Sequence, residues 1–75
     1  MNLLDYLKTL DKDALEAFAG LCGTTPGQLK QVAYGHRRAN AGLAINIERS
    51  SSGEVRCELL RPDIDWSYLR GTAAA

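Results

Sequence analysis

The chain has 75 residues, of which 45% are hydrophobic, and its nine basic residues balance its nine acidic ones. This length makes one small domain with little room for a deep active-site cleft beside its core, and the hydrophobic content excludes a disordered tail. Two cysteines are too few for a secreted disulfide framework, and no apolar stretch approaches the about 20 residues that span a bilayer, so we expect a cytoplasmic protein without a membrane partner.

The beginning of the chain predicts two short helices. Asn2 can cap a first helix, and the apolar face of that helix is formed by four leucines: Leu3, Leu4, Leu7 and Leu10. Asp11 can cap a second helix, whose apolar positions follow helical spacing: Ala14, Leu15, Phe18, Ala19 and Cys22. Gly23 follows the last of these positions and can adopt the left-handed conformation that ends a helix.

The next stretch carries a strong start signal for a third helix. Thr25 precedes Pro26, and Gln28 lies three positions after the threonine, which matches a capping box with proline in the first helical position. The inward positions of this helix are Leu29, Val32 and Ala33, and Gly35 ends it. Because only residues 23–25 separate the second and third helices, the sequence predicts a helix-turn-helix unit.

The remaining residues complete a small all-α bundle of four to five short helices. Asn40 can cap a fourth helix, and residues 50–53 end it. Residues 54–59 alternate between apolar and polar types and fit a short strand, but Cys57 could equally begin a helical turn that runs to Leu60. Asp65 can cap a last turn over residues 66–70. We therefore expect one domain over residues 1–70, with Trp66 closing its core, and a flexible tail over residues 71–75.

The third helix has a polar outer face. When its apolar residues pack on the preceding helix, six residues stay on the outer surface or at the helix start: Thr25, Pro26, Gln28, Lys30, Gln31 and Tyr34. Such a helix can enter the major groove of DNA with its first residues toward the bases, where glutamine pairs with adenine and lysine reaches guanine. These six residues are our predicted base-reading set. The alternative is an ordinary solvated face, but the tight turn favours DNA reading.

Positive charge gathers directly after this helix. Residues 17–47 contain Lys30, Arg37 and Arg38 and no acidic residue, whereas the segments on either side are net negative. We predict that four residues contact the phosphate backbone: Thr24, His36, Arg37 and Arg38. Carboxylates in this window would repel that backbone, which explains why the window lacks them.

Other chemistry has weak support. Cys22, His36 and Cys57 match no compact metal-ligand spacing, so we expect no metal or other cofactor. His36 has no positioned nucleophile for catalysis in so small a domain, so we expect no enzymatic activity. Arg61, which precedes Pro62 and Asp63, predicts a local salt bridge or a cap at a helix end.

Two segments resemble a known family. Residues 15–34, LEAFAGLCGTTPGQLKQVAY, resemble the helix-turn-helix of the lambda-repressor/Cro-like superfamily. Residues 41–66 are similar to YdaS/Cro-type prophage regulators and antitoxins through an Ile-Glu-Arg run at 47–49, a Ser-Gly step at 52–53, and Leu-Arg-Pro-Asp at 60–63 followed by Trp66.

The resemblance covers about residues 2–70 and implies a lambda-repressor-like fold. It also implies a sequence-specific regulator that occludes a promoter, either a Cro-like repressor or an antitoxin with a cognate toxin as a further partner. Because one helix reads only a few base pairs, we expect a homodimer on a double-stranded DNA operator. The alternative is a domain of the same fold that binds a toxin or a host protein.

Overall fold

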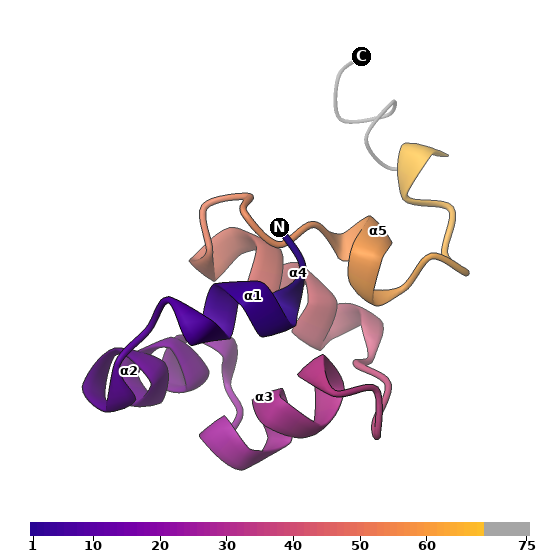
Figure 1. Cartoon of the computed structure of the whole chain (residues 1–75). Helices are drawn as coiled ribbons and strands as arrows, with labels where there is room; N and C mark the ends of the chain where they lie inside the picture. Colours follow the sequence, from indigo (N-terminus) through magenta and orange to yellow (C-terminus); the bar gives the residue numbers. More distant parts are fainter. Residues whose placement is uncertain (69–75) are drawn as a thin grey trace.

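The computed structural model describes residues 1–68, which fold into an arrangement of short helices (Figure 1). The helices are α1 (Leu3–Lys8), α2 (Lys12–Cys22), α3 (Pro26–Ala33), α4 (Ala41–Ser50) and α5 (Cys57–Leu60). Helical backbone resumes at Trp66 and continues to Tyr68. Residues 1–68 contain no strand, so the all-α prediction is confirmed, and of the two alternatives for residues 54–59 the helical turn from Cys57 to Leu60 is correct. The expected end of the last turn at residue 70 and the tail over 71–75 lie outside the described residues.

Side-chain caps begin four of the helices, as the sequence predicts. Each cap residue accepts a hydrogen bond from the backbone N–H three residues later, at 2.8 Å for Asn2, 2.8 Å for Asp11, 3.2 Å for Thr25 and 2.7 Å for Asn40. These bonds satisfy N–H groups that have no partner inside the helix. The start of every helix from α1 to α4 is therefore fixed by a local signal.

Left-handed turns end α2, α3 and α4. Gly23 has φ 75° and Gly35 has φ 81°, and in both turns the N–H after the glycine bonds a carbonyl five residues back: Thr24 to Ala19 at 3.0 Å, and His36 to Gln31 at 2.9 Å. This is the Schellman arrangement. At the end of α4 the same position is occupied by Ser52, whose φ of 56° is a left-handed value that a serine side chain disfavours.

The core gathers side chains from every part of the bundle. Its fully or almost fully buried members are Leu3, Leu7, Phe18, Ala19, Cys22, Leu29, Ile47 and Val55. The ring of Tyr6 on α1 lies 5.1 Å from that of Phe18 on α2, centroid to centroid. A second cluster joins Ala44, Cys57 and Trp66, so Trp66 closes the core as expected.

One expected core position is wrong. The sequence pattern places Ala14 on the inward stripe of α2, but this residue is exposed. At 100° per residue, Ala14 lies about 40° outside the arc that Phe18, Ala19 and Cys22 bury.

The helices are arranged so that α3 lies at one edge of the molecule. It packs against α1 and α2, whereas α4 packs against α2 and α5, and Figure 1 shows α3 at the lower edge and α5 at the upper right. Asn46 of α4 donates a hydrogen bond to the carbonyl of Cys22 at 3.2 Å, which ties α4 to the last turn of α2. This contact fixes the position from which the chain turns into α3. Within residues 1–68, no helix has the length and apolar character needed to cross a membrane.

The strained turn after α4 gives a stability prediction. Glycine adopts positive φ without the steric cost that a side chain brings, so we expect Ser52→Gly to raise the free energy of unfolding by about 0.5–1 kcal/mol, after the larger entropy of the unfolded glycine chain is deducted. The adjacent Gly53→Ala variant, at φ 83°, should lower it by about 1 kcal/mol. Urea denaturation of both variants measures the effect, and a destabilised Ser52→Gly protein would contradict strain at this turn.

Candidate nucleic-acid interface

Helix α3 presents the predicted base-reading residues along one exposed surface. Leu29 is fully buried, and Val32 and Ala33 are half-buried, which fixes the rotation of the helix. Five of the six predicted residues are exposed: Thr25, Gln28, Lys30, Gln31 and Tyr34. The sixth, Pro26, is half-buried at the first position of the helix. Gln28 and Gln31 are three residues apart, so they lie on the same side of α3.

Gln28 is held by a neighbour at the start of the helix. Its Oε1 accepts a hydrogen bond from the hydroxyl of Thr24 at 2.6 Å, so the glutamine side chain turns toward Thr24 instead of toward the N–H of Thr25 as a capping box requires. The threonine half of the predicted capping box forms, and the glutamine half does not. Thr24 therefore orients the side chain of Gln28, which is exposed.

The basic loop follows α3 directly. The left-handed turn at Gly35 reverses the chain, and His36, Arg37 and Arg38 are all exposed between this turn and the Asn40 cap of α4. The rings of Tyr34 and His36 lie 6.4 Å apart, centroid to centroid, which places both at the end of α3. Thr24, the fourth predicted phosphate contact, is half-buried at the other end of the helix.

A groove joins the two ends of this surface. It has a volume of about 590 Å³ and lies between the end of α2, α3 and the start of α4, with a lining that includes Thr24, Gln28, Arg37, Arg38, Asn40 and Asn46. The structure thus brings two predicted phosphate contacts of the loop next to Thr24 and Gln28. Lys30, Gln31 and Tyr34 are exposed but do not line this groove. Asn40 and Asn46 are groove residues that the sequence reasoning did not assign to the site, although the start of α4 directly follows the basic loop.

Asp63, which the sequence reasoning placed next to Arg61 but not in the site, lies beside the basic loop. Asp63 accepts hydrogen bonds from Arg61 through both carboxylate oxygens, at 3.0 Å from Nε and 2.8 Å from Nη2. The same carboxylate lies 3.8 Å from Arg38. The hydrogen bonds from Arg61, assisted by its charge, hold the pKa of Asp63 at about 2, so this group is ionised at neutral pH. The predicted salt bridge of Arg61 is confirmed, but the surroundings of the loop are not free of acids.

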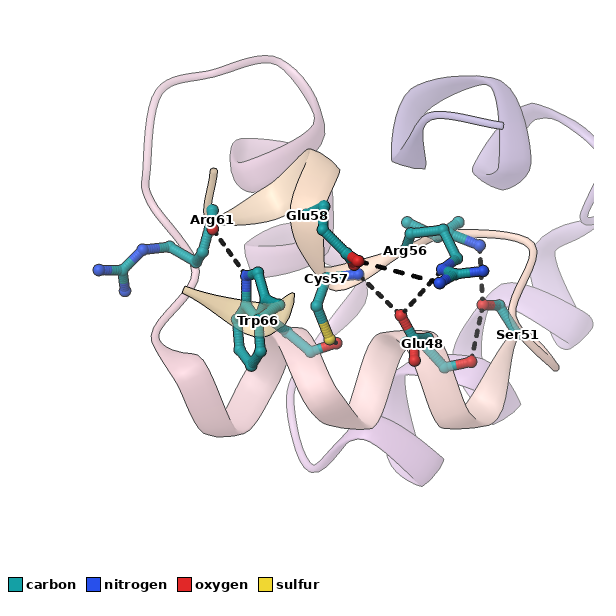
Figure 2. A network of polar contacts seen from close by, with 9 residues as sticks. Glu48, Ser51, Arg56, Cys57, Glu58, Arg61 and Trp66 are labelled. Atoms are coloured by element: carbon teal, nitrogen blue, oxygen red, sulfur yellow. Dashed lines mark hydrogen bonds and ion pairs between the residues drawn. The ribbon is translucent and has the colours of Figure 1, made fainter. Parts of the chain in front are cut away.

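Arg61 also attaches the loop to the C-terminal segment. Its Nη1 donates to the carbonyl of Ala39 at 3.0 Å, and Ala39 is a buried residue between Arg38 and the Asn40 cap. The carbonyl of Arg61 itself accepts a hydrogen bond from the indole of Trp66 at 2.7 Å. Figure 2 shows this indole pointing at Arg61 while the guanidinium extends away on the other side.

Helix α5, which precedes Arg61, is held by a carboxylate from α4. Arg56 at its start provides no side-chain cap, and Glu48 instead accepts the N–H of Cys57 at 3.0 Å and lies 3.4 Å from Arg56 (Figure 2). A carboxylate at a helix start is favoured by the helix dipole. Ser51 continues this network, since its hydroxyl accepts the N–H of Val55 at 3.1 Å. The network is a support for the C-terminal segment and lies outside the groove.

The cysteines belong to the core. Both Cys22 and Cys57 are buried thiols, and burial raises the pKa of the Cys22 thiol. The Cys57 thiol donates to the carbonyl of Ala44 at 3.4 Å. Within residues 1–68, His, Cys, Asp and Glu side chains form no group of three or more that could hold a metal ion.

Known proteins match most of the chain. Residues 14–69 match the family described as "Bacterial toxin YdaS". Over 57 residues, 76% of the chain, it is 51% identical to "Putative transcriptional regulator YdaS" of Escherichia coli K12, and this match covers 58% of that relative's length. Over 59 residues, 79% of the chain, it is 39% identical to "Prophage transcriptional regulatory protein" of the same strain, of which it covers 89%. The chain thus spans little more than half of the first relative and most of the second.

The low pKa of Asp63 predicts a pH-dependent contribution to stability. The pKa of the Asp63 carboxyl is about 2 in the folded state, against an ordinary value of 3.8. The ionised carboxylate therefore stabilises the fold above pH 4, and this contribution disappears as the pH falls through 2. We expect Asp63→Asn to lower the free energy of unfolding at pH 7, with a difference from the wild type that closes between pH 4 and pH 2. Urea titrations across this range measure the difference. If the difference in the free energy of unfolding between the two proteins stayed constant down to pH 2, the assigned ion pair would be wrong.

Proposed function

The chain belongs to the YdaS family, and from this premise we propose that it is a transcriptional regulator that binds double-stranded DNA in a sequence-specific manner. The observation that carries the proposal is the exposed polar surface of α3, which lies beside an exposed basic loop and whose Gln28 shares a groove with Arg37 and Arg38. The names of two relatives, a transcriptional regulator and a prophage transcriptional regulatory protein, support the same function.

In the proposed complex, α3 enters the major groove with its first turn toward the base pairs. Gln28 and Gln31 lie on one side of the helix, and each can pair in a bidentate manner with adenine, while Lys30 reaches a guanine or a phosphate. Thr25, Pro26 and Tyr34 complete the base-reading set at the two ends of the helix. In the free protein the Thr24 hydroxyl orients the Gln28 amide, and in the complex this hydroxyl exchanges Gln28 for a phosphate oxygen.

The phosphate backbone is assigned to residues at both ends of α3. Thr24 lies at its start, and His36, Arg37 and Arg38 lie in the loop that follows. These contacts carry no sequence information but position the helix and supply a salt-dependent part of the affinity. Because a single eight-residue helix reads only a few base pairs, the functional unit is a homodimer on a palindrome, with half-sites about 34 Å apart, or a multiple of that distance. Occupancy of such an operator within a promoter excludes the polymerase, as a Cro-like repressor or an autoregulating antitoxin does.

A second candidate keeps the fold but binds a protein, either a toxin or a host factor. The position of Asp63 beside Arg38 favours it, since the carboxylate offsets part of the positive charge that DNA binding uses. A fluorescence anisotropy titration with a duplex selected from a random-sequence pool separates the two candidates. Binding that is absent even at low salt overturns the DNA-binding proposal and favours a protein partner.

The loop arginines are expected to contribute to the affinity for every DNA duplex, whatever its sequence. We expect Arg37→Gln and Arg38→Gln, combined, to weaken the binding of every duplex by a similar factor. The slope of log K against log salt should fall by about one for each arginine–phosphate pair that the substitutions remove. Arg56→Gln is the control for the loss of one positive charge, compared with Arg37→Gln and Arg38→Gln taken singly, because Arg56 pairs with Glu48 beside α5, outside the groove. An equal weakening in the control would contradict a specific role for the loop.

The glutamines of α3 give the opposite prediction. We expect Gln28→Ala or Gln31→Ala to cost about 1–3 kcal/mol on the selected duplex and little on unrelated duplexes, because removing a base-reading side chain changes preference and leaves the backbone contacts intact. Anisotropy titrations on both kinds of duplex measure this difference. A uniform weakening on all duplexes would contradict base reading by these residues.

A further inference from the structure

Asp63 lies beside Arg38, which the proposed complex assigns to a DNA phosphate. Its carboxylate is 3.8 Å from Arg38, one of the loop arginines that line the groove. The side chains of Arg38 and Asp63 are 70% and 43% exposed, so both are open to solvent and to a ligand. A carboxylate and a phosphate oxygen present the same partner to a guanidinium, namely a negatively charged acceptor.

We propose that Asp63 competes with DNA phosphate for Arg38 and thereby sets the affinity of this protein for DNA below the value that its basic loop alone would give. This inference rests on the proposed function, since it assigns a further affinity-determining residue to the same interface.

The first argument for this role is that Asp63 cannot easily leave. Arg61 binds both carboxylate oxygens of Asp63. Arg61 is itself fixed, because its side chain donates to the carbonyl of Ala39 and its own carbonyl accepts from the indole of Trp66. A free surface carboxylate would rotate away when DNA approaches. Asp63 stays beside the loop, because its position is determined by a half-buried arginine and a buried tryptophan.

The second argument is that Arg38 can leave. At 3.8 Å and 70% exposure, its pairing with Asp63 is a weak surface contact, whereas the Arg61 pairing is short and uses both oxygens. Arg38 can therefore exchange the carboxylate for a phosphate at little cost. The fixed negative charge then remains close to the bound phosphate and repels it, and this repulsion is screened by salt.

The test is a cycle of variants at Asp63 and at the loop arginines. We expect Asp63→Asn to bind both a selected duplex and a random-sequence duplex about threefold to tenfold more tightly than the wild type at about 50 mM salt. The gain should shrink as salt rises. Asp63→Glu retains the charge and should bind within about twofold of the wild type.

Asp65→Asn is the matched control. It removes the same charge two residues away, where the side chain bonds Ser67 and the N–H of Tyr68, and it should change the affinity by less than about twofold. In an Arg38→Gln background the gain from Asp63→Asn should disappear, whereas in an Arg37→Gln background it should persist, because within residues 1–68 Arg37 has no ion-pair partner. Circular dichroism melts establish that each variant is folded at the titration temperature.

The outcomes separate this inference from the proposed function. A wild type that binds no duplex at low salt overturns both. A wild type that binds DNA, with Asp63→Asn binding no tighter, overturns the competition by Asp63 and leaves the DNA-binding proposal intact. A gain of equal size in Asp65→Asn, or one that survives Arg38→Gln, also overturns it, because the effect would then arise from overall charge.

Discussion

The burial of Leu29 is the contact on which the exposed surface of α3 depends. Leu29 is fully buried, whereas Val32 and Ala33 are only partly so. A helix of eight residues is not stable alone in water, so α3 forms because the core holds it, with about 1.5–3 kcal/mol from burying this leucine. Since the apolar contact is so narrow, the remaining circumference of the helix is available to polar side chains. The same anchor sets the direction in which Gln28, Lys30 and Gln31 point.

The placement of α3 along the chain follows from local signals, which is why the sequence predicts it well. Gly23 ends α2 with positive φ, Thr25 caps α3, and Gly35 ends α3 in the same left-handed way. Each signal acts within five residues, so the pattern of side chains is sufficient to place it. The helical turn at Cys57 cannot be distinguished from a strand in this way, because its cap, Glu48, comes from another helix nine residues earlier. Periodicity alone cannot detect such a cap.

The candidate site is predictable only in part, for the same reason. Exposure of the α3 residues and of the loop follows from helical spacing, and the groove follows once α3 is anchored. The role of Arg61 cannot be predicted from the sequence, because its side chain bonds the carbonyl of Ala39, 22 residues earlier. Every residue has a backbone carbonyl, so the sequence does not indicate which one Arg61 binds. Asp63 is predictable as a partner of Arg61, which is close in sequence, but not as a neighbour of Arg38.

The distribution of charge in space therefore differs from its distribution along the chain. Residues 17–47 contain no acidic residue. The fold nevertheless places Asp63 of the C-terminal segment beside Arg38 in the basic loop. Trp66 determines this return, since its indole bonds the carbonyl of Arg61 and its ring is buried beside Ala44 and Cys57. The packing of Trp66 into the core and the placement of the Asp63 charge beside the loop therefore depend on each other. A substitution that loosens Trp66 would release Asp63 as well as weaken the core, so the potential at the loop depends on a residue outside the loop.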